Sequence, residues 1–243
     1  MYSFCPLLPC TDGAEPYASE GLIQTADGNF YGTTILGGEY NSGTVFRITP
    51  SGVLSTLYSF CSKMATNGAC TDGSDPAAGL IQAPGGDFYG TTGTGGPSNL
   101  GTIFTMTPNG ALTTLHSFCE VNYDGCAAYP GPLAQATNGN FYGTTSYGGV
   151  PGGSGTIFRL SMGLGPFVEP QTTFGQVGAA VSILGTDLTG ATSVSFNGAS
   201  AVFTVVSATE ITAIVPAGAT TGTVQVLTPR GTLSSNVPFR VLP

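Results

Sequence analysis

Short runs in which apolar and polar residues alternate fill most of the chain, and glycine-containing turns separate them. Residues 21–34, GLIQTADGNFYGTT, form two such runs joined at an Asp-Gly pair, and residues 43–60, GTVFRITPSGVLSTLYSF, form two more joined at a Ser-Gly pair. Alternation favours half-buried strands, and these turn residues allow the positive φ angles that tight hairpins need. No segment keeps an apolar period of about 3.6 residues over the length of a helix. The pattern therefore predicts an all-β fold.

The same pattern occurs three times, which predicts a tandem repeat. The motif FYGTT begins at Phe30, Phe88 and Phe141, a spacing of 58 and then 53 residues. GTVF or GTIF follows each motif, and the first two copies end in YSFC or HSFC. The third copy runs on without such an ending, whereas MYSFC begins at Met1. We therefore expect three four-stranded β-meander repeats, circularly permuted, over residues 1–162.

The number of repeats limits how the meanders can be arranged. Four-stranded units of this length are similar to propeller blades, but propellers usually contain at least about four blades. The predicted arrangement is therefore propeller-blade-like or an open array, with an unpaired strand edge at its end. The residues expected to form a strand that pairs with the third repeat of the same chain, or with that of a neighbour to make a polymer, are Met1, Tyr2, Ser3 and Phe4.

Residues 163–243 follow a different rhythm, without the repeat motifs. Alternating runs such as AVSILG, SVSFNG, AVFTVVS and EITAIVP are separated by Gly, Ala and Asn turns about every ten residues. Short strands at this spacing are typical of a two-sheet sandwich. The prediction is a second domain over residues 163–243 with an Ig-like β-sandwich fold.

Composition and charge narrow the possible partners. Charged residues make up 7% of the 243 residues, Lys63 is the only lysine, and the formal net charge is -8. Such a chain lacks the basic cluster that displaces counterions from phosphates, so nucleic acid is not an expected partner. No apolar run approaches the roughly 18 residues that span a bilayer, so membrane insertion is not expected either.

The six cysteines form three local pairs, one at the same place in each repeat. Four, eight and six residues separate the members of the pairs, and in the chain-entropy model each bridge would stabilise the fold by roughly 2–3 kcal/mol. The alternative is a metal site, but there is no CxxC motif and His116 is the only histidine. The expected disulfides are Cys5 with Cys10, Cys61 with Cys70, and Cys119 with Cys126.

Disulfides persist in oxidising compartments, so the cysteines predict a protein outside the cytoplasm. No stretch of this sequence has the order of a secretion signal. Met1 aligns with the leucine of LYSF, which suggests a strand residue rather than the start of a leader. The predicted location is therefore extracellular or at the cell surface, after removal of a signal peptide that is not present in this chain.

Residues for catalysis are few. A Ser-His-Asp or Cys-His site would have to use His116, which replaces the Tyr2 and Tyr58 of the same motif. Such an interchange suits a half-exposed strand position better than a base with a tuned pKa. We expect no enzymatic activity and no organic cofactor.

A calcium hypothesis comes from two acidic turns. TDGAEP and TDGSDP each hold two carboxylates three residues apart, and carboxylate oxygens are the ligands that calcium prefers. The third repeat has only Asp124 there, and an Asp-Gly turn needs no metal. The candidate ligands are Asp12, Glu15, Asp72 and Asp75.

The Phe-Tyr pairs of the three FYGTT motifs recur in one register. Stacked repeats would align them in rows, and exposed aromatic rows could bind a glycan. The alternative is that they are core residues, with the tyrosine hydroxyls reaching outward.

Two families share motifs with this chain. YGTT..GG, GTVF and L.SF resemble the GloVer tandem repeats of bacterial surface proteins over residues 1 to about 160, which implies export and display on the cell surface and brings no catalytic residues. The remainder resembles an IPT/TIG domain, an immunoglobulin-like spacer or binding module. The positions that match it are Gly175, Gly178, Val181, Ile183, Gly185, Val194, Phe196, Ile211, Val215, Pro216, Gly222, Val224, Val226 and Phe239.

Together these features predict an exported, non-enzymatic structural protein of bacterial surfaces. It would assemble head to tail with copies of itself into an extracellular fibre or surface layer through strand or sheet-edge complementation. The alternative is a monomeric extracellular carbohydrate-binding or adhesion module.

Overall fold

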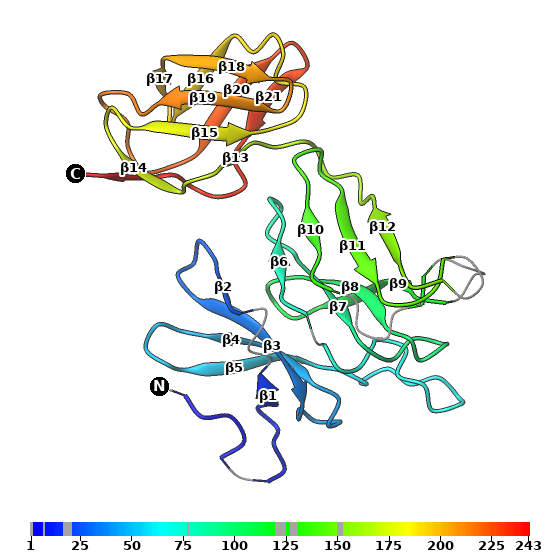
Figure 1. Cartoon of the computed structure of the whole chain (residues 1–243). Helices are drawn as coiled ribbons and strands as arrows, with labels where there is room; N and C mark the ends of the chain where they lie inside the picture. Colours follow the sequence, from blue (N-terminus) through cyan, green and yellow to red (C-terminus); the bar gives the residue numbers. More distant parts are fainter. Residues whose placement is uncertain are drawn as a thin grey trace. The chain divides into compact units, whose positions relative to one another are not determined.

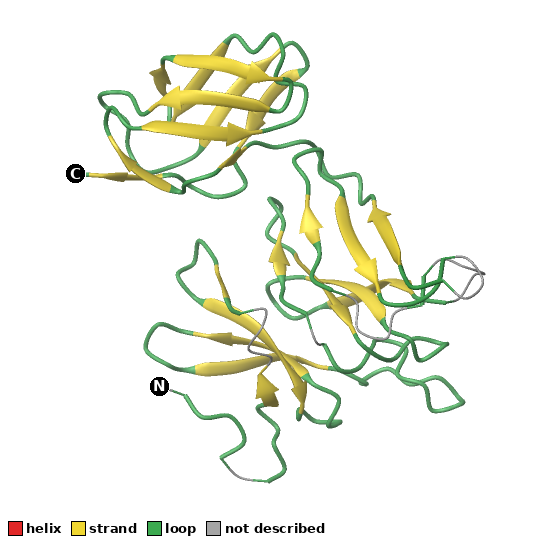
Figure 2. Ribbon diagram, in the orientation of Figure 1, coloured by secondary structure: helices red, strands yellow, loops and turns green. Residues whose placement is uncertain are grey.

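The structure, a computed structural model, describes residues 2–6, 8–16, 21–76, 78–119, 125–126, 131–149 and 153–243. Every regular element in these ranges is a β-strand, which confirms the all-β prediction (Figure 2). No helix in the same ranges is long and apolar enough to cross a membrane. The chain forms two compact units, one of residues 1–134 and 141–160 and the other of residues 135–140 and 161–243.

The first repeat is an antiparallel sheet in the order β1-β3-β4-β5, with β2 also pairing with β3 (Figure 1). The meander of β2 to β5 was predicted, whereas β1 was not, because it lies in a short segment without alternation. The strands are β1 (Ala14–Pro16), β2 (Ile23–Gln24), β3 (Phe30–Leu36), β4 (Thr44–Ile48) and β5 (Leu54–Ser59).

The second repeat reproduces the meander with four strands, and the third contains three. The strands of the second are β6 (Ile81–Gln82), β7 (Phe88–Thr92), β8 (Thr102–Met106) and β9 (Leu112–Ser117). Those of the third are β10 (Ala134–Gln135), β11 (Phe141–Thr145) and β12 (Thr156–Leu160). In the described part of the chain β12 pairs only with β11, so its outer edge carries no counterpart of β5 or β9.

The repeat motifs meet at one end of each sheet. In the first repeat the hydroxyls of Thr34 and Thr44 lie 2.8 Å apart across β3 and β4, and the equivalent pairs of the other repeats are 2.9 Å apart. Gly13, in the TDG turn, lies directly on this pair, because a Cβ there would come within 2.5 Å of Thr34 Oγ1. Gly37 has a φ of +78° and lies against the Cys10 carbonyl. The TDG, GTT and Gly-Gly motifs are therefore parts of one packed corner.

Successive repeats pack face to face through the FYGTT aromatics. The Tyr31 ring lies 4.5 Å from that of Phe88, and the Tyr89 ring lies 4.3 Å from that of Phe141. All four side chains are buried. The tyrosine of each of the first two motifs thus covers the phenylalanine of the next repeat, in the offset or tilted geometry that aromatic pairs commonly adopt.

A second contact joins the end of one repeat to the sheet of the next. Phe60, which follows β5, packs edge-on against Phe104 at 5.3 Å between ring centroids. Phe118, which follows β9, packs in the same way against Phe158 at 5.4 Å. Each repeat therefore has a face turned to the preceding repeat, here called the leading face, and an opposite face turned to the following one, called the trailing face.

The second unit contains a two-sheet sandwich, as predicted. One sheet has the order β13-β15-β19-β18 and the other β17-β16-β20-β21, with all pairs antiparallel, while β14 and β22 form a separate parallel pair. A single apolar cluster between the sheets includes Ile183, Phe196, Ile211 and Phe239. The strands are β13 (Glu169–Pro170), β14 (Phe174–Gln176), β15 (Ala180–Leu184), β16 (Ser193–Phe196), β17 (Ala199–Ala201), β18 (Phe203–Ser207), β19 (Glu210–Ile214), β20 (Val224–Thr228), β21 (Gly231–Ser234) and β22 (Arg240–Leu242).

Candidate functional site

The three predicted disulfides are present. Each links the end of one repeat segment to the start of the next, with Cα atoms 4.4, 4.6 and 4.9 Å apart, and in the first two the second cysteine directly precedes the TDG turn. They indicate an oxidising environment, since reducing compartments keep such thiols free. The pairs are Cys5–Cys10, Cys61–Cys70 and Cys119–Cys126.

A buried carboxylate joins the first repeat to the second beside one of these bridges. Asp72 is fully buried, and its Oδ2 accepts hydrogen bonds from the Tyr58 hydroxyl at 2.6 Å, the Ser62 amide at 2.9 Å and the Ser62 hydroxyl at 2.8 Å. Burial, and then the hydrogen bond to Asp72, raises the pKa of Tyr58 well above its ordinary value. The carboxylate therefore fixes the direction in which the chain leaves β5.

The N-terminal segment, residues 2–5, has the same contact with the first repeat. The Tyr2 hydroxyl donates to Asp12 Oδ2 at 2.7 Å, and the Cys5 amide donates to the same carboxylate at 3.2 Å. The hydrogen bond to Asp12 is the main cause of the raised pKa of Tyr2. Tyr2 and Asp12 are thus the counterparts of Tyr58 and Asp72, at the leading face of the first repeat.

The strand predicted for Met1, Tyr2, Ser3 and Phe4 is not formed in the described part of this chain. Met1 lies outside the described residues, and residues 2–4 have no strand assignment, because no neighbouring strand supplies ladder hydrogen bonds to them. The segment instead lies on its own first sheet, where Phe4 packs edge-on against Phe46 at 5.0 Å. This contact matches those of Phe60 and Phe118 with the repeats that follow them.

The calcium candidates do not come together in groups of three or more. Within the described residues no cluster of that size of His, Cys, Asp or Glu side chains occurs. Glu15 is exposed, while Asp75 accepts a hydrogen bond from the Thr94 hydroxyl at 2.9 Å. Asp12 and Asp72 serve the tyrosine contacts described above, and Asp124 lies outside the described residues. These contacts favour the turn interpretation, and calcium binding stays a prediction.

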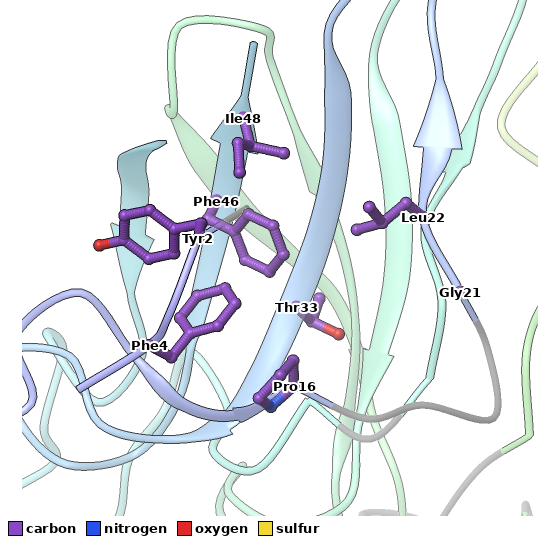
Figure 3. A pocket seen from close by; sticks show the side chains of 8 residues that line it. All are labelled: Tyr2, Phe4, Pro16, Gly21, Leu22, Thr33, Phe46 and Ile48. Atoms are coloured by element: carbon purple, nitrogen blue, oxygen red, sulfur yellow. The ribbon is translucent and has the colours of Figure 1, made fainter. Parts of the chain in front are cut away.

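A hollow of about 340 Å³ opens on the leading face of the first repeat (Figure 3). Its lining is mainly apolar. Figure 3 shows Tyr2, Phe4 and Phe46 to the left of the strand that carries Thr33, and Leu22 to its right. The residues that line it are Tyr2, Phe4, Pro16, Gly21, Leu22, Thr33, Phe46 and Ile48.

The equivalent leucines show why this face is hollow. Leu80 and Leu133 are 4% and 5% exposed, whereas Leu22 is 52% exposed. All three occupy the equivalent position in the GLIQ-type segment of their repeats. Since the second and third repeats each follow another repeat and the first does not in this structure, the exposure of Leu22 marks an uncovered leading face.

The trailing face of the third repeat is uncovered in the same way. Val45 and Ile103 are 0% and 1% exposed, whereas their counterpart Ile157 on β12 is 82% exposed. The hydroxyls of Thr33 and Thr91 donate across to the next repeat, to the Ala78 and Gly131 carbonyls. The two ends of the repeat array thus present opposite halves of the contact that occurs twice inside it.

Four of the six residues in the aromatic rows considered as a glycan platform are core residues. Tyr31, Tyr89, Phe88 and Phe141 are all at most 5% exposed, because each lies between two repeats. His116, the candidate base, packs edge-on against Phe118 at 5.2 Å. The four buried aromatic residues favour the core interpretation of the FYGTT motif, whereas Phe30 and Tyr142, at the two ends of the rows, are half-buried.

Sequence reasoning found the cysteines and the N-terminal segment but missed the tyrosine–aspartate contact. The sequence does contain a signal for this contact, because Tyr2 and Asp12 recur as Tyr58 and Asp72. In both copies the tyrosine precedes a cysteine pair and the aspartate follows it. It also missed which residues would face a neighbour. Equivalent positions in the three repeats identify these residues only when the direction in which the repeats stack is known.

Comparison with protein families gives one match. The model for the Gloeobacter/Verrucomicrobia repeat matches residues 2–205. This range includes all three repeats and continues into the second unit, although FYGTT and GTIF do not recur after residue 160. A comparison with curated proteins finds no match.

Comparison with solved structures gives distant likenesses. One is a fungal alcohol oxidase of the AA5 family in complex with copper, with 14% identity and a TM-score of 0.35, over 89% of this chain and 52% of that protein. Another is a protein assigned as a gluconolactonase, with 14% identity and a TM-score of 0.33, over 83% of this chain and 61% of that protein. This chain thus spans about half to three-fifths of their lengths. TM-scores this low carry no argument about activity.

Proposed function

The chain belongs to the Gloeobacter/Verrucomicrobia repeat family, and we propose that it is an exported, non-enzymatic structural protein that assembles head to tail with copies of itself. The product of this assembly is an extracellular fibre or surface layer. The observation that carries the proposal is the pair of uncovered end faces, at Leu22 and Ile157, whose counterparts inside the array are buried.

Export is supported by the three disulfides. Each bridge closes the loop that precedes the sheet of one repeat. Each is expected to stabilise the fold by roughly 2–3 kcal/mol in the chain-entropy model. A stabilisation of this kind is useful only where the bridges stay oxidised, which supports an extracellular location.

Head-to-tail association is supported by the difference between the two ends. A contact made by two unlike surfaces of identical chains is heterologous, and it propagates into an open filament unless the rotation closes a ring. The uncovered leading face and the uncovered trailing face are unlike surfaces of this kind. Their apolar side chains, when exposed together, favour association over solvation.

We assign the second unit to the IPT/TIG type as part of the same proposal. Of the positions that resemble that family, Val181, Ile183, Val194, Phe196 and Ile211 are buried in the single core of the sandwich. A sandwich that buries its own apolar residues suits a spacer between assembling repeat arrays.

The experiment is sedimentation velocity and electron microscopy of the intact chain. We expect species larger than the monomer whose abundance rises with concentration, and elongated particles in the images. A protein that stays monomeric at the highest attainable concentration contradicts the proposal.

The alternative function, a carbohydrate-binding or adhesion module, needs a surface other than the four FYGTT aromatics that are buried between repeats. A glycan array probed with the intact chain tests it. A specific glycan signal from a strictly monomeric protein would favour that alternative.

A further inference from the structure

We propose that the junction between two copies reproduces the internal seam between repeats. The N-terminal segment of one copy would add to the free edge of β12 of the other, and the leading face of its first repeat would cover the trailing face around Ile157. This inference rests on the proposed head-to-tail assembly and specifies which surfaces make it.

The internal seams supply the template for the strand contact. In the first repeat β4 pairs with β5, with Thr44 opposite Ser59 and Val45 opposite Tyr58. The chain then crosses to the second repeat, where the Phe60 amide still donates to the Gly43 carbonyl at 3.0 Å while its ring packs on Phe104. One short segment therefore belongs to two repeats at once.

The second seam repeats this arrangement residue by residue. Thr102 lies opposite Ser117 and Ile103 opposite His116. The Phe118 amide donates to the Gly101 carbonyl, again at 3.0 Å. The register is thus the same in both seams, although tyrosine is replaced by histidine.

The N-terminal segment already makes the half of this contact that faces its own repeat. Phe4 lies on Phe46 as Phe60 lies on Phe104, and the Tyr2 hydroxyl is held by Asp12 as that of Tyr58 is held by Asp72. The other half of the contact, backbone hydrogen bonding to the last strand of a preceding repeat, remains to be made. Within the described chain that ladder is not formed.

β12 offers the matching half. Its outer edge is unpaired in the described residues, and Gly155, Thr156 and Ile157 occupy the places of Gly43, Thr44 and Val45. The proposed register therefore puts Ser3 opposite Thr156 and Tyr2 opposite Ile157. It directs the Phe4 amide of one copy to the Gly155 carbonyl of the other, as in strand addition.

Side-chain packing supplies the larger part of this junction, because the added strand is short. In the first seam Tyr31, Val45 and Phe60 share one buried cluster with Leu80 and Phe104 of the second repeat. The hollow beside Leu22 is the space that a preceding repeat would occupy in such a cluster (Figure 3). A second copy would fill it with the counterparts of Tyr31 and Val45, which are Tyr142 and Ile157.

The test uses two variants of the full chain, each blocking one surface. Ile157→Asp places a charge on the trailing face, and Leu22→Asp places one on the leading face. Both side chains are more than half exposed in the single chain, so each variant is expected to fold. Sedimentation velocity of each variant alone should show monomer, whereas a one-to-one mixture should show dimer and nothing larger, because one intact surface of each kind remains.

Val202→Asp is the matched control, since Val202 is 78% exposed in the second unit and outside the proposed junction. It should associate as the parent chain does. If the parent polymerises and both blocking variants do so equally, the junction lies elsewhere and this inference is wrong while the assembly stands. If the parent itself stays monomeric, the proposed function fails. The milder Ile157→Ser and Leu22→Ser replace any aspartate variant that loses its calorimetric transition.

Discussion

The seam between the first and second repeats and the free end of the third repeat are built from the same kinds of residue, yet one is buried and the other exposed. Val45 is 0% exposed in the seam, and Ile157, in the same place on its sheet, is 82% exposed. Neither alternation nor hydrophobicity distinguishes the two positions. The difference comes only from whether a further repeat lies alongside.

This comparison explains how the first unit differs from the second. Each repeat is one sheet, so it buries an apolar face only against another repeat. The sandwich has two sheets that cover each other around Ile183 and Ile211, so its core is complete within one chain. An array of single sheets, in contrast, always has two ends that a neighbour could cover.

The largest expected effect contrasts Val45 with Ile157. Val45→Asp puts an unpaired charge into the seam and should destabilise the first unit by about 4 kcal/mol or unfold it. Ile157→Asp, at the exposed counterpart, should change the free energy of unfolding by less than about 0.5 kcal/mol. Calorimetry at low protein concentration, where association is negligible, measures both. Equal destabilisation by the two changes would mean that the trailing face is already covered.

The next effect contrasts the two tyrosine–aspartate contacts. Asp72→Ala removes a fully buried carboxylate that accepts hydrogen bonds from the Tyr58 hydroxyl and from Ser62, and should destabilise the first unit by about 3 kcal/mol. Asp12→Ala, at the half-buried counterpart on the leading face, should cost only about 1 kcal/mol. Chemical unfolding followed by circular dichroism gives both values, because the chain has no tryptophan for fluorescence.

Unfolding in the presence of calcium is the control for the Asp12→Ala and Asp72→Ala variants. If Asp12 and Asp72 act only as hydrogen-bond acceptors, millimolar calcium should leave the unfolding midpoints of the parent and both variants unchanged. A calcium-dependent rise in the parent that either alanine variant abolishes would instead support the metal hypothesis.

Removal of the seam disulfide should have an intermediate effect. Replacing both Cys61 and Cys70 by serine opens a loop between the first two repeats and should cost roughly 2–3 kcal/mol in the chain-entropy model. The calorimetric transition of the sandwich should not move, since the second unit contains no cysteine. A shift of both transitions by the same amount would show that the units unfold together.

Much of the fold was predictable from sequence because its signals are local. The hairpin turns, the repeat period and the cysteine pairs each involve residues close together in the chain, and they gave the meanders, the sandwich and the three bridges. β1 was missed because Ala14–Pro16 is too short to show alternation. The exposure of Leu22 was not predictable, because the GLIQ segment that contains it is identical to the segment that contains Leu80.

The N-terminal segment shows the same limit. Its letters match those of the segment ending in Phe60, and the matching contacts with the following sheet are present. The strand is absent because a ladder needs a partner edge. Sequence similarity therefore predicted the side-chain contacts of the segment and not its backbone pairing.

The smallest effect concerns the hairpin turn of the first repeat. Hydrogen bonds from the Thr25 hydroxyl and from Asn29 hold the pKa of Asp27 well below its usual range. The stability that this carboxylate contributes is therefore present above its unfolded pKa of about 4 and is lost as the pH falls below it. In Asp27→Asn the unfolding free energy of the first unit should fall less steeply between about pH 5 and pH 2 than in the parent.

An internal control for this change exists in the third repeat. There Asn138 takes the same place, and its side-chain oxygen accepts from the Asn140 amide at 3.0 Å, as Asp27 Oδ1 does from the Asn29 amide at 3.0 Å. Asparagine thus maintains the turn. An identical acid slope in parent and variant would show that Asp27 contributes nothing to the pH dependence.

Hydrogen exchange of the intact chain, measured by mass spectrometry at low and high protein concentration, tests the central claim most directly. We predict that peptides containing Leu22 and peptides containing β12 gain protection together as concentration rises, while those from the interior strands β7 and β8 stay unchanged. Protection at neither end, or at only one of them, would contradict the account that the two uncovered faces bind each other.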